Sequence, residues 1–95
     1  MKHKYYYNNQ LVRTSENEYK YALLFKCEDG TYKTCKCSSS YDACLKELNY
    51  KTKAEKISKE TGLSFDEIWE SRKYNLCSSQ FCERENYIIV ELEQR

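Results

Sequence analysis

The chain has 95 residues, 16 of them basic and 15 acidic, so its formal net charge is +1. This balance excludes a protein that attracts nucleic acid by bulk charge, and it also excludes an acidic mimic of DNA. The longest apolar run, Ala22 to Phe25, is far too short to cross a membrane.

The supply of side chains that can form a core is small. Leu, Ile, Val and Phe together make up 17 of the 95 residues, although ten tyrosines and one tryptophan add apolar area. Small domains with so thin a core often need a disulfide or a bound metal for stability. The N-terminus has no apolar stretch of the kind found in secretory signal peptides, so we expect a cytoplasmic protein with reduced cysteines.

Residues 4–37 are predicted to form an antiparallel meander of four short strands. Asn8 and Asn9 tolerate the positive φ of a two-residue hairpin turn. Residues 19–27 place apolar side chains at every second position, which is typical of a half-buried strand. The turn signal Glu28-Asp29-Gly30 then returns the chain as a fourth strand.

Residues 39–74 are predicted to be helical, in two or three segments. The first segment has apolar residues at the spacing of one helical face. Gly62 is suited to end a second helix. Two capping-box patterns predict where the second and third helices begin, namely Thr52 with Glu55 and Ser64 with Glu67.

The chain ends with a cysteine-containing loop, residues 76–83, and a strand, residues 86–93. The strand is rich in β-branched residues, and we expect it to join the meander. The predicted fold class is therefore α+β, with a meander of about four strands, a C-terminal strand, and two or three inserted helices. We expect a single domain over residues 1–95.

The six cysteines predict a metal site. Side-chain alternation places Cys35 and Cys37 on one face of their strand. Cys77 and Cys82 are separated by four residues, the wide end of the spacing seen in structural zinc sites. Two ligands from a strand and two from a remote loop make a four-thiolate site. We therefore predict a structural zinc bound by Cys35, Cys37, Cys77 and Cys82, with Cys44 as a substitute ligand.

Other roles for these cysteines stay open. A reduced cysteine often packs in a core as a small hydrophobe, which suits the apolar positions of Cys27 and Cys44. Disulfide bonds are a third alternative. The face on which Cys27 lies depends on the hairpin turn that follows it, which is either Asp29-Gly30 or Glu28-Asp29-Gly30. A two-residue turn pairs Cys27 with Tyr32, whereas a three-residue turn pairs it with Thr31.

Residues 54–73 resemble a helix-turn-helix unit, so a DNA-binding regulator is one alternative function. However, Asp66 and Glu67 stand where a recognition helix begins, and their charges would repel phosphates. The simpler interpretation is a helical hairpin packed on the sheet. Its core residues are expected to be Ile57, Leu63, Ile68 and Trp69.

Two groups of residues are candidates for partner binding. They are Tyr5, Tyr6, Tyr7, Lys51, Lys53 and Lys56. The tyrosines suit an interface because one end of each is apolar and the other polar. They could instead fill the core, or stack single-stranded nucleic acid, which is the second alternative function. The lysines form either a contact patch or a solvated helix face.

We expect no enzymatic activity. His3 is the only histidine, so a cysteine nucleophile has a single candidate base. The sequence has no Gly-rich phosphate loop. A zinc ion bound by four thiolates would also have no open coordination position.

The segment "KYYYNNQLVRTSENEYKYALLFKCEDGTYKTCKCSSSYDAC", residues 4–44, resembles small proteins of Gram-positive phages and mobile elements. In those proteins an N-terminal hairpin, an "LVRTS" strand and a "YKYALL" strand precede a cysteine or serine and a helix. Proteins of this size and source include inhibitors of CRISPR effector nucleases, some of which bind zinc. The resemblance implies an anti-CRISPR protein that inhibits a type II effector nuclease. The near-neutral charge suggests that it binds a protein surface on the effector and blocks DNA loading or nuclease movement.

Overall fold

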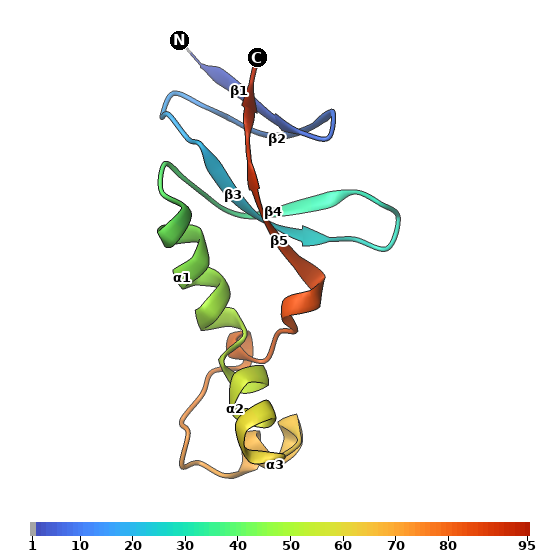
Figure 1. Cartoon of the computed structure of the whole chain (residues 1–95), viewed down its shortest axis with the longest axis vertical. Helices are drawn as coiled ribbons and strands as arrows, with labels where there is room; N and C mark the ends of the chain where they lie inside the picture. The colour runs from blue at the N-terminus through green and yellow to red at the C-terminus, as the bar shows by residue number, and fades with distance from the viewer. Residues whose placement is uncertain (1) are drawn as a thin grey trace.

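The computed structural model describes residues 2–95, and this part of the chain folds as an α+β protein, as predicted (Figure 1). The strands are β1 His3–Tyr7, β2 Gln10–Ser15, β3 Tyr21–Lys26, β4 Tyr32–Ser38, β5 Tyr87–Glu91 and β6 Glu93–Gln94. The α-helices are α1 Tyr41–Lys51, α2 Lys53–Thr61 and α3 Phe65–Glu70. Two 3-10 helices follow, η1 Ser78–Gln80 and η2 Arg84–Asn86.

The strands form two antiparallel sheets of three strands each, in the orders β2-β1-β6 and β4-β3-β5. The single meander predicted over residues 4–37 is therefore wrong, because β2 and β3 belong to different sheets. The chain between them is held by the Tyr5 hydroxyl. This group donates to the Asn17 carbonyl (2.9 Å) and accepts from the Tyr19 N–H (3.0 Å).

The two hairpin turns match the sequence. Asn8 and Asn9 both have positive φ, at 50° and 64°, and form the two-residue turn between β1 and β2. In the β3–β4 hairpin the Cys27 N–H donates to the Thr31 carbonyl (2.9 Å). Of the two turns left open by the sequence, the structure therefore has the three-residue one. Gly30 takes the positive φ of 86° that this turn needs.

The C-terminal segment joins the two sheets. β5 pairs with β3 along its whole length, which confirms the predicted C-terminal strand. The Leu92 N–H then donates to the Lys20 carbonyl (2.8 Å), and β6 continues onto β1 beside Tyr5 and Tyr6.

The β4-β3-β5 sheet is the middle layer of the molecule. One of its faces is covered by the other sheet, and this core contains Ala22, Leu24 and Val90, with Tyr7 and Val12 packed against them. The opposite face is covered by α1, and this core contains Leu23, Cys44 and Leu48. Both faces of β3 are therefore buried.

The ends of the short helices follow local sequence signals in two cases. Gly62 ends α2 with a φ of 77°, and its N–H donates to the Ser58 carbonyl (2.8 Å). Ser64 and Glu67 form the predicted capping box at the start of α3, with bonds of 3.1 and 3.2 Å.

The capping box predicted for Thr52 and Glu55 is wrong. Thr52 is buried between α1 and α2, and its hydroxyl donates to the Leu48 carbonyl (2.8 Å). It therefore satisfies the end of α1 rather than the start of α2. Glu55 accepts from the Arg84 N–H instead.

The molecule is elongated, with extents of 49 × 26 × 18 Å. Helices α2 and α3 lie at the end opposite the chain termini (Figure 1). Their main helical contacts are with each other and with α1, so the expectation that this hairpin packs on the sheet is wrong. None of the helices within residues 2–95 has the length and apolar character needed to cross a bilayer.

We predict that Tyr5→Phe lowers the free energy of unfolding by about 1–3 kcal/mol, because it removes a buried hydroxyl and leaves two backbone groups without their partner. Urea denaturation measures this change. Tyr6→Phe is the matched control, since Tyr6 is only half buried, and it should change stability by less than about 0.5 kcal/mol. Equal effects of the two substitutions would contradict the role given to the Tyr5 hydroxyl.

Candidate protein-binding surface

Three aromatic side chains lie close together at the end of the molecule that contains α2 and α3, which we call the helical end. Two of them lie on α3 and the third lies just after η1. The centroid of the Phe81 ring lies 5.7 Å from that of Phe65 and 5.6 Å from that of Trp69, both edge to face. Trp69 is the only tryptophan and is 57% exposed. We call Phe65, Trp69 and Phe81 the aromatic tip. A large aromatic group that is held by neighbours yet exposed is typical of an interface anchor.

Local structure places the aromatic tip. Phe65 and Trp69 lie four residues apart, so they are neighbours on one face of α3. Ile68 is buried and fixes α3 to the molecule. Phe81 follows η1, where the buried Gln80 side chain accepts from the Cys77 N–H (2.8 Å).

Trp69 was expected in the core, and this prediction is wrong. Helix α3 has only six residues and lies beyond the sheets, so just one side of it is covered. Of the four predicted core residues only Ile68 is buried, whereas Ile57 and Leu63 are half buried; Ala54 on α2 is buried as well.

The aromatic tip has an acidic border. Its rings line a shallow pocket of about 270 Å³ together with Asp66 and Ser78. Asp66, Glu67 and Glu70 are all exposed on α3. They outnumber Arg72, the one cation lining a neighbouring hollow that Trp69 and Glu70 also line. Negative charge around an apolar centre suits a protein surface that carries basic residues, and it disfavours phosphate groups.

The three N-terminal tyrosines lie mainly in the fold rather than on its surface. Tyr5 is fully buried, so its predicted role in partner contact is wrong. Tyr7 is half buried and packs against the core between the sheets. Tyr6 is half buried beneath the Arg95 guanidinium, which lies 4.4 Å from the ring centroid. These rings do not form an open stacking platform.

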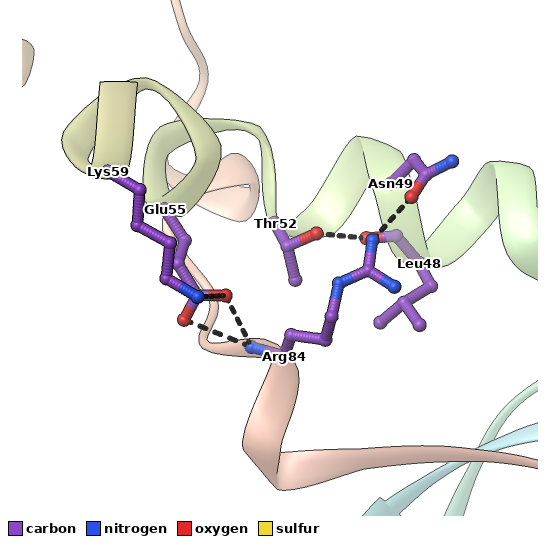
Figure 2. A network of polar contacts seen from close by, with 6 residues as sticks. All are labelled: Leu48, Asn49, Thr52, Glu55, Lys59 and Arg84. Atoms are coloured by element: carbon purple, nitrogen blue, oxygen red, sulfur yellow. Dashed lines mark hydrogen bonds and ion pairs between the residues drawn. The ribbon is translucent and has the colours of Figure 1, made fainter. Parts of the chain in front are cut away.

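The three lysines predicted to bind a partner line two different hollows. Lys51 is half buried and lines a small hollow with Cys35 and Tyr87. Lys53 and Lys56 are exposed and line an open groove between α1, α2 and η2. Figure 2 shows the polar network along this groove.

Arg84 is the centre of that network. Its guanidinium donates to the Asn49 amide oxygen on α1, and its backbone N–H donates to the Glu55 carboxylate on α2 (3.3 Å). Lys59 lies 3.8 Å from the same carboxylate. The network therefore ties η2 to both helices (Figure 2).

Cys35 and Cys37 lie on opposite faces of the middle sheet, so the prediction of a shared face is wrong. Cys37 packs in the core between the sheets, and Cys35 packs in the core beneath α1. The cause is a β-bulge: Leu23 pairs with Lys36 and Leu24 with Thr34, which leaves Cys35 unpaired. One extra residue reverses the alternation on which the prediction depended.

Cys35 and Cys82 are nevertheless brought together around Tyr87. Burial raises the pKa of the Tyr87 hydroxyl, and the neighbouring side chains of Cys82 and Cys35 raise it further. The Cys82 N–H donates to the Lys51 carbonyl (3.0 Å), which ties the cysteine loop to the end of α1. Cys77 is exposed, and Cys44 is fully buried under α1.

Within residues 2–95, no three His, Cys, Asp or Glu side chains are gathered in a way that could hold a metal ion. The structure brings together one cysteine from each predicted ligand pair but not all four. The zinc ion stays a prediction.

None of the aromatic tip was predicted from sequence as a binding site, and neither was Arg84. Phe81 is the only large apolar residue between Cys77 and Cys82, and this isolation is a signal that could have identified it. Arg84 has no comparable signal, because its partners Asn49 and Glu55 lie 35 and 29 residues away.

Comparison with known proteins adds no assignment. No family model, no curated protein and no solved structure matches the chain.

We predict that iodoacetamide modifies Cys77 first and Cys44 last. Burial raises the pKa of Cys35, Cys37 and Cys44, so at a given pH each has less reactive thiolate. Labelling of these three should therefore increase at higher pH than labelling of an unburied thiol with a pKa of about 8.5. Peptide mass spectrometry over time measures the order. In denaturant the differences should disappear, and equal rates for Cys44 and Cys77 in the folded protein would contradict the structure.

Proposed function

We propose that this chain is a non-enzymatic protein-binding inhibitor that contacts its partner through the aromatic tip. The exposure of Trp69 is the observation that carries the proposal. The edge-to-face contact with Phe81 holds the indole in place, so little side-chain entropy is lost on binding. Burying an aromatic group in a partner pocket is a common source of hot-spot energy.

A non-enzymatic role is supported by the position of the one histidine. His3 Nδ1 lies 2.7 Å from the Gln94 amide nitrogen in the β1–β6 pair. Its ring packs edge to face on Tyr5. The His3 side chain therefore stabilises the β2-β1-β6 sheet, which we call the terminal sheet. No cysteine takes part in these contacts.

Protein is a better ligand for this surface than nucleic acid. Helix α3 would be the recognition helix of a DNA-binding unit, but its first residues include Asp66 and Glu67. Carboxylates there oppose the phosphate contacts on which affinity for DNA depends. The tyrosines that could stack single-stranded bases are occupied within the fold, above all Tyr5.

The resemblance of residues 4–44 supports a host protein as the partner, and a type II CRISPR effector nuclease in particular. Such nucleases carry positively charged surfaces that hold nucleic acid. A basic surface is the complement of the acidic border of the aromatic tip. The inhibitor would act by blocking DNA loading or nuclease movement.

We further propose the structural zinc predicted from sequence. Cys35 lies beside Tyr87, and the side chain of Cys82 affects the same hydroxyl, which supports a link between the middle sheet and the cysteine loop. Cys77 could turn inward from its exposed position at the start of η1 to complete such a site.

Protein purified without chelator should hold about one zinc per chain, because a structural site of this kind contributes on the order of 10 kcal/mol. Elemental analysis measures the metal. The double substitution Cys77→Ser/Cys82→Ser should remove the zinc and lower the melting temperature, whereas Cys27→Ser should do neither. Metal-free protein whose melting is unchanged by the double substitution would contradict the zinc proposal.

Trp69→Ala should weaken binding to a purified type II effector nuclease by about 30-fold or more, corresponding to at least about 2 kcal/mol. Biolayer interferometry with immobilised nuclease measures the affinity. Leu11→Ala is the matched control, since Leu11 is 48% exposed but lies on β2 at the other end of the molecule.

Three outcomes separate the parts of this proposal. Wild-type affinity in Trp69→Ala contradicts the aromatic tip as the contact surface. The absence of any complex with such nucleases contradicts the partner. Tight binding to duplex DNA alone, with a steep dependence on salt, contradicts a protein-binding function.

A further inference from the structure

The groove between α1, α2 and η2 is a second surface with its own chemistry. It encloses about 600 Å³. Its lining residues are Asn49, Thr52, Lys53, Glu55, Lys56, Lys59, Glu60 and Arg84. Four of these side chains are cationic and two are anionic, so the groove is positive in a protein that is almost neutral overall.

Most of this positive charge has no partner within the fold. Lys59 forms an ion pair with Glu55. Within residues 2–95, Lys53, Lys56 and the Arg84 guanidinium form no ion pair. Cations that outnumber the carboxylates on a concave surface attract an anionic ligand more strongly than the same charges on a convex surface.

Arg84 is held in position before any ligand arrives. The Glu55 carboxylate accepts from its backbone N–H, and Asn49 accepts from one end of its guanidinium (Figure 2). A guanidinium has five N–H donors, and within residues 2–95 only one atom of this group, Nη2, is engaged. The rest of its planar edge can bind a carboxylate through two parallel hydrogen bonds.

We propose that this groove binds an acidic peptide segment of a partner protein. The spacing of the cations fits such a segment. The two lysines that form no ion pair within the described residues, Lys53 and Lys56, lie about 4.5 Å apart along the axis of α2, and their flexible side chains can place the two ammonium groups further apart than that. Alternate residues of an extended peptide lie about 6.6 Å apart and point to the same side. Two carboxylates at alternate positions can therefore reach two of the groove's cations at once.

A nucleic-acid strand fits the groove less well. None of the lining residues is aromatic, so the groove offers no surface for base stacking. Glu55 and Glu60 also stand among the lysines of α2. They would repel a continuous row of phosphates, whereas separate carboxylates can be placed between them.

Fluorescence polarisation with a labelled peptide of alternating Glu and Ser tests the proposal in the full chain. The peptide should bind at physiological salt, and a peptide of alternating Gln and Ser should not. Lys53→Glu/Lys56→Glu should weaken binding by about tenfold or more, because each substitution replaces attraction with repulsion. Lys4→Glu/Lys26→Glu makes the same change in net charge on exposed strand residues outside the groove and should change binding less than about twofold.

Four outcomes would overturn the proposal. They are no binding of the Glu peptide, equal binding of the Gln peptide, equal losses in the two double variants, and tighter binding of a thymidine oligonucleotide than of the Glu peptide. Arg84→Lys provides a further test, because it keeps the charge but removes the planar fork, and it should still weaken binding about threefold or more. Trp69→Ala should leave peptide binding unchanged, so this proposal and that of the aromatic tip can fail separately.

Discussion

Burial of β3 on both faces is the constraint on which the rest of the structure depends. Ala22, Leu23 and Leu24 are consecutive, and each is fully inaccessible to solvent. Because neighbouring strand residues point to opposite faces, this requires a cover on each side of the sheet. The terminal sheet supplies one cover and α1 supplies the other. The few aliphatic residues of the chain are thereby concentrated around one strand, which β4 and β5 flank on either side.

The helical end lies outside this core, and polar contacts add to the packing of its few buried apolar residues, Ala54 and Ile68. The Cys82 N–H bonds to the Lys51 carbonyl, and Arg84 joins η2 to α1 and α2. Bonds of this kind contribute about 0.5–1.5 kcal/mol each, far less than a packed sheet. The same lack of cover leaves Trp69 and the lysines of α2 exposed. The part of the molecule with the least core is therefore the part in which large aromatic and cationic side chains stay exposed.

Most local signals predicted local structure correctly, the Thr52–Glu55 capping box being an exception, and contacts between remote residues account for several of the errors. The Asn8-Asn9 turn, the Gly62 helix end and the Ser64 capping box each depend on a few neighbouring residues. The separation of β2 from β3 depends on the Tyr5 hydroxyl, whose partners are 12 and 14 residues away. The shared face of Cys35 and Cys37 failed because one bulged residue shifts the alternation, and the sequence contains no signal for that bulge. The exposed Trp69 could not be foreseen from periodicity, since an apolar stripe on a helix looks the same whether or not another element covers it.

The near-neutral net charge conceals a separation of charge at the helical end. Helix α3 carries Asp66, Glu67 and Glu70 around the aromatic tip, whereas the groove beside α2 is lined by Lys53, Lys56, Lys59 and Arg84. A partner that engages both surfaces must present a basic border around an apolar pocket and an acidic segment nearby. A surface of uniform charge would be attracted to one side and repelled by the other. Charge separation of this kind would select among partners by pattern rather than by total charge, and the net charge of +1 for the whole chain gives no sign of it.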